Sequence, residues 1–256
     1  NYEAFAMPLM PGTQEVGASP SGGPLPVTRV SNGGADYMHW SNGGATLNWA
    51  MGPVVYAAQT SAFFPAAPLA KDAKPVKFEP PKTGISLSMP VTADRPTGMV
   101  AFTGARIVTM ADKSSGVIDN GVVLVENDRI KAVGKAGEIA IPAGAKTVDV
   151  AGKTIIPGLV DAHAHGPHGS DEMTPQQNWV NMLNLAFGVT TRHDPSSSAA
   201  TVFPALEMQR AGLIVGPRSF STGEIVYGAK AADVYAEING LDDALAHVRR
   251  LKAQGA

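Results

Sequence analysis

The spacing of apolar residues changes along the chain, from a period of two to a period of about 3.6 after residue 165. Between residues 98 and 153 the apolar residues fall in short runs that indicate strands. These predicted strands lie at 100–110, 122–125 and 130–134. From residue 154 onward, apolar runs alternate with amphipathic stretches. This order predicts parallel strands joined by helices, in three successive units.

The first amphipathic stretch carries signals for a helix. Thr174 is predicted as its N-cap, Pro175 as its first residue and Gln177 as the partner that closes a capping box, and Gly188 is predicted to end it. Its predicted apolar face consists of Trp179, Met182, Leu183, Ala186 and Phe187. Further strands are predicted at 189–191 and 218–222, and further helices at 201–211 and around Leu241, Leu245, Val248 and Leu251.

Residues 1–64 contain short apolar and aromatic runs separated by glycine-rich turns. Asn42-Gly43 lies between two strand-like segments, and Asn-Gly favours a hairpin because its turn needs positive φ. The string from Trp40 to Trp49 resembles the repeated hairpin of TolB-like β-propellers, with Asn42 in place of the usual aspartate. About one blade is visible, and an unrelated β-hairpin is the alternative interpretation. Seven prolines between Pro65 and Pro96 then predict a linker or an irregular edge segment.

Composition limits the classes of partner. Charged residues make up 16% of the chain and the net charge is −2, which gives no electrostatic reason to expect a nucleic acid or an anionic membrane. No run approaches the roughly 20 apolar residues that a membrane span needs. The chain has no cysteine, so disulfides and thiolate ligands are excluded. A bound metal would need nitrogen and oxygen donors.

Two histidines, His163 and His165, follow an apolar run that begins at Thr154. Residues i and i+2 of a strand point to the same side, so both imidazoles are expected to reach one metal ion. The pattern is short and common by chance, and a structural role is the alternative. Barrel enzymes place their chemistry where strands end, so metal ligation and a structural role both stay open at this point.

Four other residues are candidates for the same site. Asp161 is expected to orient the strand end or a ligand histidine. His168 follows in a loop, where a substrate contact is one interpretation and an exposed surface position is the preferred one. His193 and Asp194 come after the next predicted strand, so they are expected to support a ligand or to face the substrate, with a structural role as the alternative.

The sequence also gives expectations for two further residues. Arg192 is expected to point away from His193 if the strand extends that far, because neighbouring residues of a strand face opposite sides. His247 lies on the last predicted helix and is interpreted as a structural or surface residue.

Residues 98–230 resemble the amidohydrolase half of proteins that fuse a TolB-like propeller to an imidazolonepropionase-like or prolidase-like amidohydrolase. The segments that carry this resemblance are 103–110, 118–121, 155–165, 187–191, 193–196 and 216–223. The resemblance implies a (β/α)8 barrel that hydrolyses C–N bonds of small amide or peptide-like substrates by means of one or two divalent ions, usually zinc. Together with the preceding segment 157–161, His163 and His165 match the first-strand metal motif of that superfamily, and this resemblance favours metal ligation over a structural role.

The resemblance also implies ligands that this chain does not contain. In the superfamily, a lysine on strand four, histidines on strands five and six and a proton-shuttling aspartate on strand eight complete the site. A barrel takes about 250 residues, and only about 100 follow Lys153. We therefore expect an internal fragment whose catalytic residues are unknown and which is inactive alone.

The predicted fold class is mixed: a β-propeller blade remnant, a small β-sandwich and the first three βα units of an incomplete (β/α)8 TIM barrel. The predicted domains are the end of a propeller at 1–64, a proline-rich linker at 65–97, the sandwich at 98–153 and the barrel part at 154–256. The alternative function is a non-catalytic scaffold for protein interaction. The TolB-like resemblance favours a periplasmic or exported location, although no signal peptide is visible. The oligomeric state stays open, with a homo-oligomer as one alternative.

Overall fold

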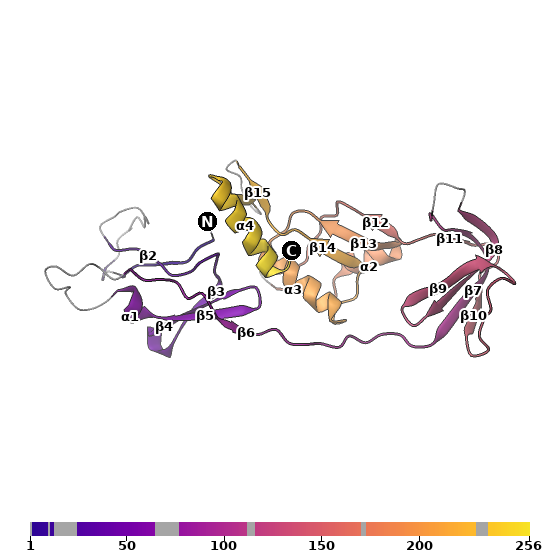
Figure 1. The fold of residues 1–256 in the computed structure, drawn as a ribbon, viewed down its shortest axis with the longest axis horizontal. Helices are drawn as coiled ribbons and strands as arrows, with labels where there is room; N and C mark the ends of the chain where they lie inside the picture. Colours follow the sequence, from indigo (N-terminus) through magenta and orange to yellow (C-terminus); the bar gives the residue numbers. More distant parts are fainter. Residues whose placement is uncertain are drawn as a thin grey trace.

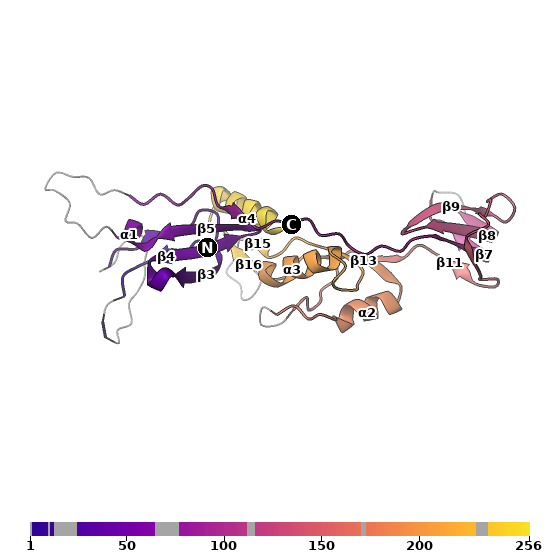
Figure 2. The same ribbon diagram turned by 90° about the horizontal axis from the view of Figure 1, so that it is seen from below.

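The computed structural model describes residues 2–9, 11–12, 25–64, 77–111, 116–169, 173–228 and 235–256. The molecule is elongated, with an antiparallel sheet near the N-terminus at one end and a five-stranded sheet at the other (Figure 1). A small parallel sheet with its helices lies between them, and the view from below shows the same three parts in a row (Figure 2). No helix among the described residues is long and apolar enough to cross a bilayer.

The N-terminal part is built on a four-stranded antiparallel sheet with the order β3-β4-β5-β6. The turn η1 (Asn42–Gly44) joins the first two strands, and Asn42 and Gly43 have φ of 52° and 64°. This confirms the predicted hairpin. The strands are β3 (Asp36–Ser41), β4 (Thr46–Met51), β5 (Val54–Gln59) and β6 (Ile85–Ser86), and the other elements of this part are β1 (Phe5–Ala6), β2 (Thr28–Arg29) and α1 (Thr60–Phe63).

One side of this sheet carries an apolar core. Trp49 is buried and stacks on Tyr56, with 5.8 Å between the ring centroids. Leu47, Val30 and Phe63 pack in the same cluster. The sheet has the strand count of a propeller blade, but a propeller needs several blades, so the propeller remnant stays a prediction.

The proline-rich segment is partly a strand. Residues 65–76 of the predicted linker lie outside the described residues. Strand β6 falls inside the predicted linker and pairs with β5 at the edge of the sheet. Residues 87–97 then form neither helix nor strand and run along the molecule to the five-stranded sheet (Figure 1). The described part therefore contains both an edge strand and a linker.

The five-stranded sheet confirms the strands predicted from alternation. Its order is β10-β7-β8-β9, and β11 also pairs with β7. The strands are β7 (Met99–Val108), β8 (Val117–Glu126), β9 (Arg129–Lys135), β10 (Lys146–Asp149) and β11 (Thr154–Ile155). Asn127, with φ of 57°, turns the chain from β8 into β9. The described strands form one sheet, and the second layer of the predicted sandwich stays a prediction.

The third part has the predicted alternation of strand and helix. Strands β12 (Leu159–Asp161), β13 (Val189–Asp194) and β14 (Arg218–Ser221) are parallel neighbours in sequence order. Helix α2 (Trp179–Ala186) connects the first two strands, and α3 (Ala199–Arg210) connects the second and third. The short parallel pair β15 (Ile225–Tyr227) and β16 (Tyr235–Glu237) was not predicted and precedes α4 (Leu241–Gln254). Three parallel strands are compatible with part of a barrel, and the closed barrel stays a prediction.

The apolar run before the histidines is two strands, not one. Strand β11 pairs with β7 in the five-stranded sheet, whereas β12 pairs with β13 in the parallel sheet. Between them lies Pro157, which has no backbone N–H to donate to a ladder. Next to it, a Cβ on Gly158 would lie 2.0 Å from the Thr190 hydroxyl oxygen. The break reflects these two residues, and it leaves His163 and His165 in the loop after β12.

The start and the inward face of α2 also differ from the prediction. Its N-cap is Asn178, whose side chain accepts a hydrogen bond from the Val180 N–H, while Thr174 and Gln177 lie outside the helix. The predicted apolar face is exposed, at 71% for Trp179. The helix instead buries Asn181, because this amide meets a buried cation on β13.

Helix α4 packs against the N-terminal part through polar residues. Leu251 is buried as predicted, but Leu241 is 76% exposed. The other buried residues of α4 are His247 and Arg250. The Arg250 guanidinium carbon lies 3.6 Å from the centroid of the Tyr2 ring, and the His247 ring meets the same tyrosine edge-on. His247 is therefore a buried residue of the contact between α4 and the N-terminal segment.

Candidate functional site

The histidine loop is fixed beside the end of β13. The Ala164 N–H donates to the His193 carbonyl oxygen at 2.8 Å, and the Ala164 side chain is buried. Ala162 and His163 form a turn after β12, and the side chains of His163 and His165 lie on the same side of this loop, with their Nε2 atoms 3.0 Å apart. The sequence prediction that the two imidazoles share one side agrees with this arrangement, although both lie beyond the strand.

The two imidazoles converge. Their Nε2 atoms lie 3.0 Å apart, and the ring planes meet at 72°. Both side chains are exposed. The Asp161 carboxylate accepts the backbone N–H of His163 at 3.1 Å, so this residue shapes the turn that leads into the pair.

Asp194 lies behind His165 and is 1% exposed. Its Oδ2 is 2.8 Å from Nε2 of His168, and its Oδ1 accepts the Ser196 N–H at 3.0 Å. The same Oδ1 lies 3.5 Å from Nδ1 of His165. Burial raises the pKa of Asp194, but the hydrogen bonds from His168 and Ser196 outweigh it, so the pKa lies below its ordinary value.

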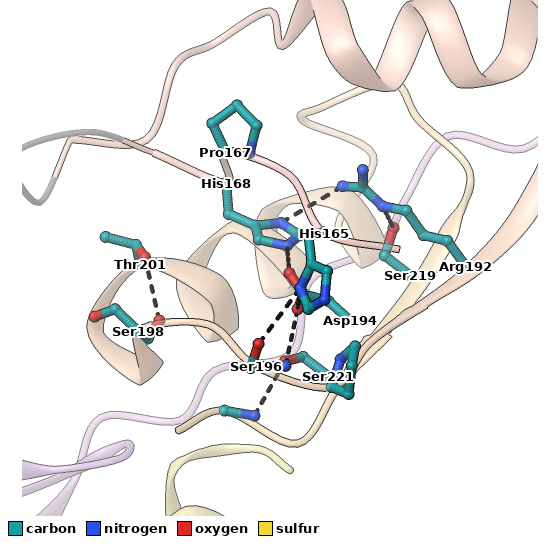
Figure 3. A network of polar contacts seen from close by, with 12 residues as sticks. His165, Pro167, His168, Arg192, Asp194, Ser196, Ser198, Thr201, Ser219 and Ser221 are labelled. Carbon is teal, nitrogen blue, oxygen red and sulfur yellow. Dashed lines mark hydrogen bonds and ion pairs between the residues drawn. The ribbon is translucent and has the colours of Figure 1, made fainter. Parts of the chain in front are cut away.

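His168 is buried, at 4% exposure, which corrects the expectation of an exposed loop histidine. The loop turns inward because the Asn178 side chain, at the start of α2, donates to the Pro167 carbonyl at 2.7 Å. The imidazole then lies between Arg192 and Asp194 (Figure 3). The structure therefore brings together His168 and Asp194, two of the four residues that the sequence suggested beside the histidine pair.

Arg192 is a site residue whose role sequence reasoning missed. It is 2% exposed, and it donates to Ser219 Oγ at 2.9 Å and to Asn181 Oδ1 at 2.7 Å. Its Nη2 also lies 3.5 Å from His168 Nδ1. Burial lowers the pKa of Arg192, against the opposing effect of nearby carboxylates. A signal was present in the sequence, because Arg192 and Asp194 are two residues apart on one strand and so face one side.

His193 leaves β13 on the face opposite to Arg192 and Asp194, as expected from alternation. Its side chain is half-buried. Its contact with the histidine loop is made by the backbone carbonyl that accepts the Ala164 N–H. The structure thus places the backbone of His193 at the site.

The histidine pair fits two ligands of one metal ion. Two Zn–N bonds of about 2.0–2.1 Å at a tetrahedral angle put the nitrogens roughly 3.3 Å apart, close to the 3.0 Å observed. Within the described ranges, no group of three or more His, Asp or Glu side chains is arranged to hold a metal. The described chain thus supplies two donors, where zinc sites take three or four.

Comparison with known proteins finds relatives for part of the chain. No family model matches it. A dihydroorotase of Geobacter sulfurreducens is 30% identical over 148 residues, which are 55% of this chain and 33% of that protein. An imidazolonepropionase of Sphingopyxis alaskensis is 41% identical over 70 residues, which are 27% of this chain and 17% of that protein. The chain spans about a third or less of the length of these curated relatives.

A solved structure shares the fold. A Xaa-Pro dipeptidase with methionine bound in its active site matches with a TM-score of 0.50 and 18% identity, over 62% of this chain and 45% of that chain. This likeness concerns the fold alone. Over part of its length, the chain is thus similar to curated members of the amidohydrolase superfamily of hydrolases.

Proposed function

We propose that this chain carries the first part of the active site of a metal-dependent hydrolase that cleaves C–N bonds in small amide or peptide-like substrates. The observation that carries the proposal is the convergence of the His163 and His165 Nε2 atoms, 3.0 Å apart, beside the carboxyl ends of parallel strands. Parallel βα proteins place their chemistry at this end of the strands. The similarity to dihydroorotase and imidazolonepropionase supports the bond class.

In this proposal the two histidines hold a divalent ion, zinc as the first choice, through their unprotonated Nε2 atoms. Such an ion, when bound, lowers the pKa of a coordinated water and polarises a carbonyl group. Asp161 holds the turn that presents His163. His193 is proposed to face the substrate, because it leaves β13 on the face away from the buried Arg192 and Asp194.

The proposal also limits what residues 1–256 do alone. Two protein donors bind zinc weakly, and the proton-shuttling aspartate of the superfamily has no counterpart here. We therefore expect weak metal binding and no turnover from this chain. The competing function is a non-catalytic scaffold. The coding DNA after Ala256 distinguishes the two: a continuing frame with a strand-borne lysine, two histidines and a late aspartate supports the hydrolase, and an immediate stop codon favours the scaffold.

The ligand assignment is tested on the chain itself. Zn²⁺ is titrated into protein with ¹⁵N-labelled histidines, and the imidazole resonances of His163 and His165 are expected to shift first. The double variant His163→Ala and His165→Ala is expected to lose this binding, whereas His39→Ala, on an exposed face of β3 remote in the fold, is expected to keep it. Equal zinc affinity in the double variant and the unaltered chain would exclude the pair as ligands.

A further inference from the structure

We propose that Asp194 is a positioning residue: it holds His165 with the ring proton on Nδ1, which leaves Nε2 free for the metal, and Arg192 and His168 hold Asp194 in place. The inference rests on the proposed function, because it concerns one of the same two ligands. It adds a buried row of donors and acceptors that reaches from the interior of the parallel sheet to the ligand (Figure 3).

The first step fixes the proton on His168. A guanidinium has only donors, so His168 Nδ1, 3.5 Å from Nη2 of Arg192, must be the acceptor. The proton of the neutral imidazole is then on Nε2, which lies 2.8 Å from Asp194 Oδ2 and donates to it. The hydrogen bonds therefore run in one direction, from Arg192 through His168 to Asp194.

The second step concerns the other carboxylate oxygen. An ionised carboxylate only accepts hydrogen bonds. Asp194 Oδ1 takes the Ser196 N–H at 3.0 Å and faces Nδ1 of His165 at 3.5 Å. The Ser196 hydroxyl oxygen lies 3.4 Å from the same Nδ1. A negative acceptor at this position favours a proton on Nδ1, and a histidine that binds metal through Nε2 commonly donates its other ring N–H to a carboxylate.

The third step explains why Asp194 is well placed for this role. Arg192 and Asp194 are 2% and 1% exposed, so each is a buried charge that needs the other for compensation. Two further Arg192 N–H groups donate to Asn181 Oδ1 on α2 and to Ser219 Oγ on β14. The carboxylate itself is held by the His168 imidazole and the Ser196 N–H, and its Oδ1 lies 3.5 Å from Nδ1 of His165.

The two ligands are consequently held in different ways. Asp161 contacts His163 through the backbone N–H, which sets the path of the loop. Asp194 contacts His165 at the ring. Changing Asp194 is therefore expected to alter the ring of His165 far more than that of His163.

The test reads the ring nitrogens directly. In the metal-free chain with ¹⁵N-labelled histidines, ring nitrogen shifts are expected to show His165 protonated on Nδ1 and His168 on Nε2. Asp194→Asn is expected to convert His165 to a mixture of tautomers and to weaken Zn²⁺ binding about 10- to 100-fold. His39→Gln changes an exposed histidine on β3, remote from the site, and is expected to leave both readouts unchanged.

The outcomes separate this inference from the proposed function. If His165 in the unaltered chain carries its proton on Nε2, the positioning role is overturned, whether or not the Asp194 variant folds. Zinc affinity that stays within about twofold in a folded Asp194→Asn protein would also overturn it, while the two histidines could still be ligands. If Zn²⁺ shifts neither His163 nor His165, the proposed function itself fails, and the tautomers then describe only a buried network.

Discussion

At the scale of single residues, the parallel sheet contains a pair of opposite charges separated by the His168 imidazole. Arg192 and Asp194 are both buried, and His168 lies between them with hydrogen-bond distances to each. Burying such charges costs free energy, which the partners offset only together. The network is therefore expected to fail as a unit when one member is removed.

Removal of Arg192 tests this. The substitution Arg192→Met replaces only the aliphatic part of the side chain and leaves the Asp194 charge without its buried partner, so the free energy of unfolding is expected to fall by about 3–5 kcal/mol. Urea unfolding followed by circular dichroism measures the change. Arg210→Met, on an exposed position of α3, serves as the matched control and is expected to stay within about 0.5 kcal/mol. Equal stabilities of the two variants would contradict the coupling.

Sequence reasoning selected the two histidines that the structure brings together, but it missed most of the contacts around them. His163 and His165 could be singled out because the signal is local: two histidines at i and i+2 beside an apolar strand. The burial of His168 could not, since it depends on Asn178 and Asp194, which lie 10 and 26 positions further along the chain. Arg192 was placed on the correct face relative to His193, but its partner Ser219 comes from a different strand.

At the scale of elements, α2 depends on a cap that also holds the histidine loop. The Asn178 side chain accepts the Val180 N–H with its oxygen and donates to Pro167 with its nitrogen. Asn178→Ala is expected to lower the free energy of unfolding by about 1 kcal/mol or more, because a cap and a loop contact disappear together. Thermal unfolding measures it. Thr174→Ala removes the cap that the sequence predicted and is expected to have little effect on stability. A larger loss of stability in Thr174→Ala than in Asn178→Ala would instead support Thr174 as the N-cap.

Strands were predicted well and the environment of helices less well. In β7, β8 and β9 the alternation of apolar residues reports directly on a half-buried sheet, and all three were found at the predicted places. In α2 the same reasoning selected the apolar face as the buried one, but the inward position is taken by Asn181 because Arg192 needs an acceptor there. The prediction assumed that the apolar face of a helix is the buried one, and here a polar contact between Asn181 and Arg192 determines the buried face instead.

At the scale of the whole molecule, a polar contact joins the N-terminal segment to the end of the chain. Arg250 lies over the Tyr2 ring and donates to Glu224 at 3.0 Å. Glu224 also accepts the Ala199 N–H at the start of α3. Asp36 on β3 accepts from Gln254 at the end of α4. The contact thus links residues from both ends of the chain, and no local sequence pattern indicates it.

This contact makes the stability sensitive to alkaline pH. Burial raises the pKa of Tyr2, and the charge of Glu224 raises it further, against a lowering effect of Arg250. Because the folded pKa is above the unfolded value of about 10, the stability from neutral Tyr2 is fully present below pH 10 and is lost as the pH rises through the folded pKa. Unfolding midpoints of the unaltered chain and Tyr2→Phe are expected to diverge above pH 10, with the variant less affected; parallel curves would contradict this.

The short connection between the five-stranded sheet and the histidine loop has a mechanical consequence. Only Ile156, Pro157 and Gly158 separate β11 from β12. The proline fixes its own φ, and the glycine lies against Thr190 with no room for a side chain. The connection therefore has little conformational freedom, and the position of the five-stranded sheet constrains where β12 begins. We expect a rotation of the five-stranded sheet to shift β12 and, with it, the loop that carries His163 and His165.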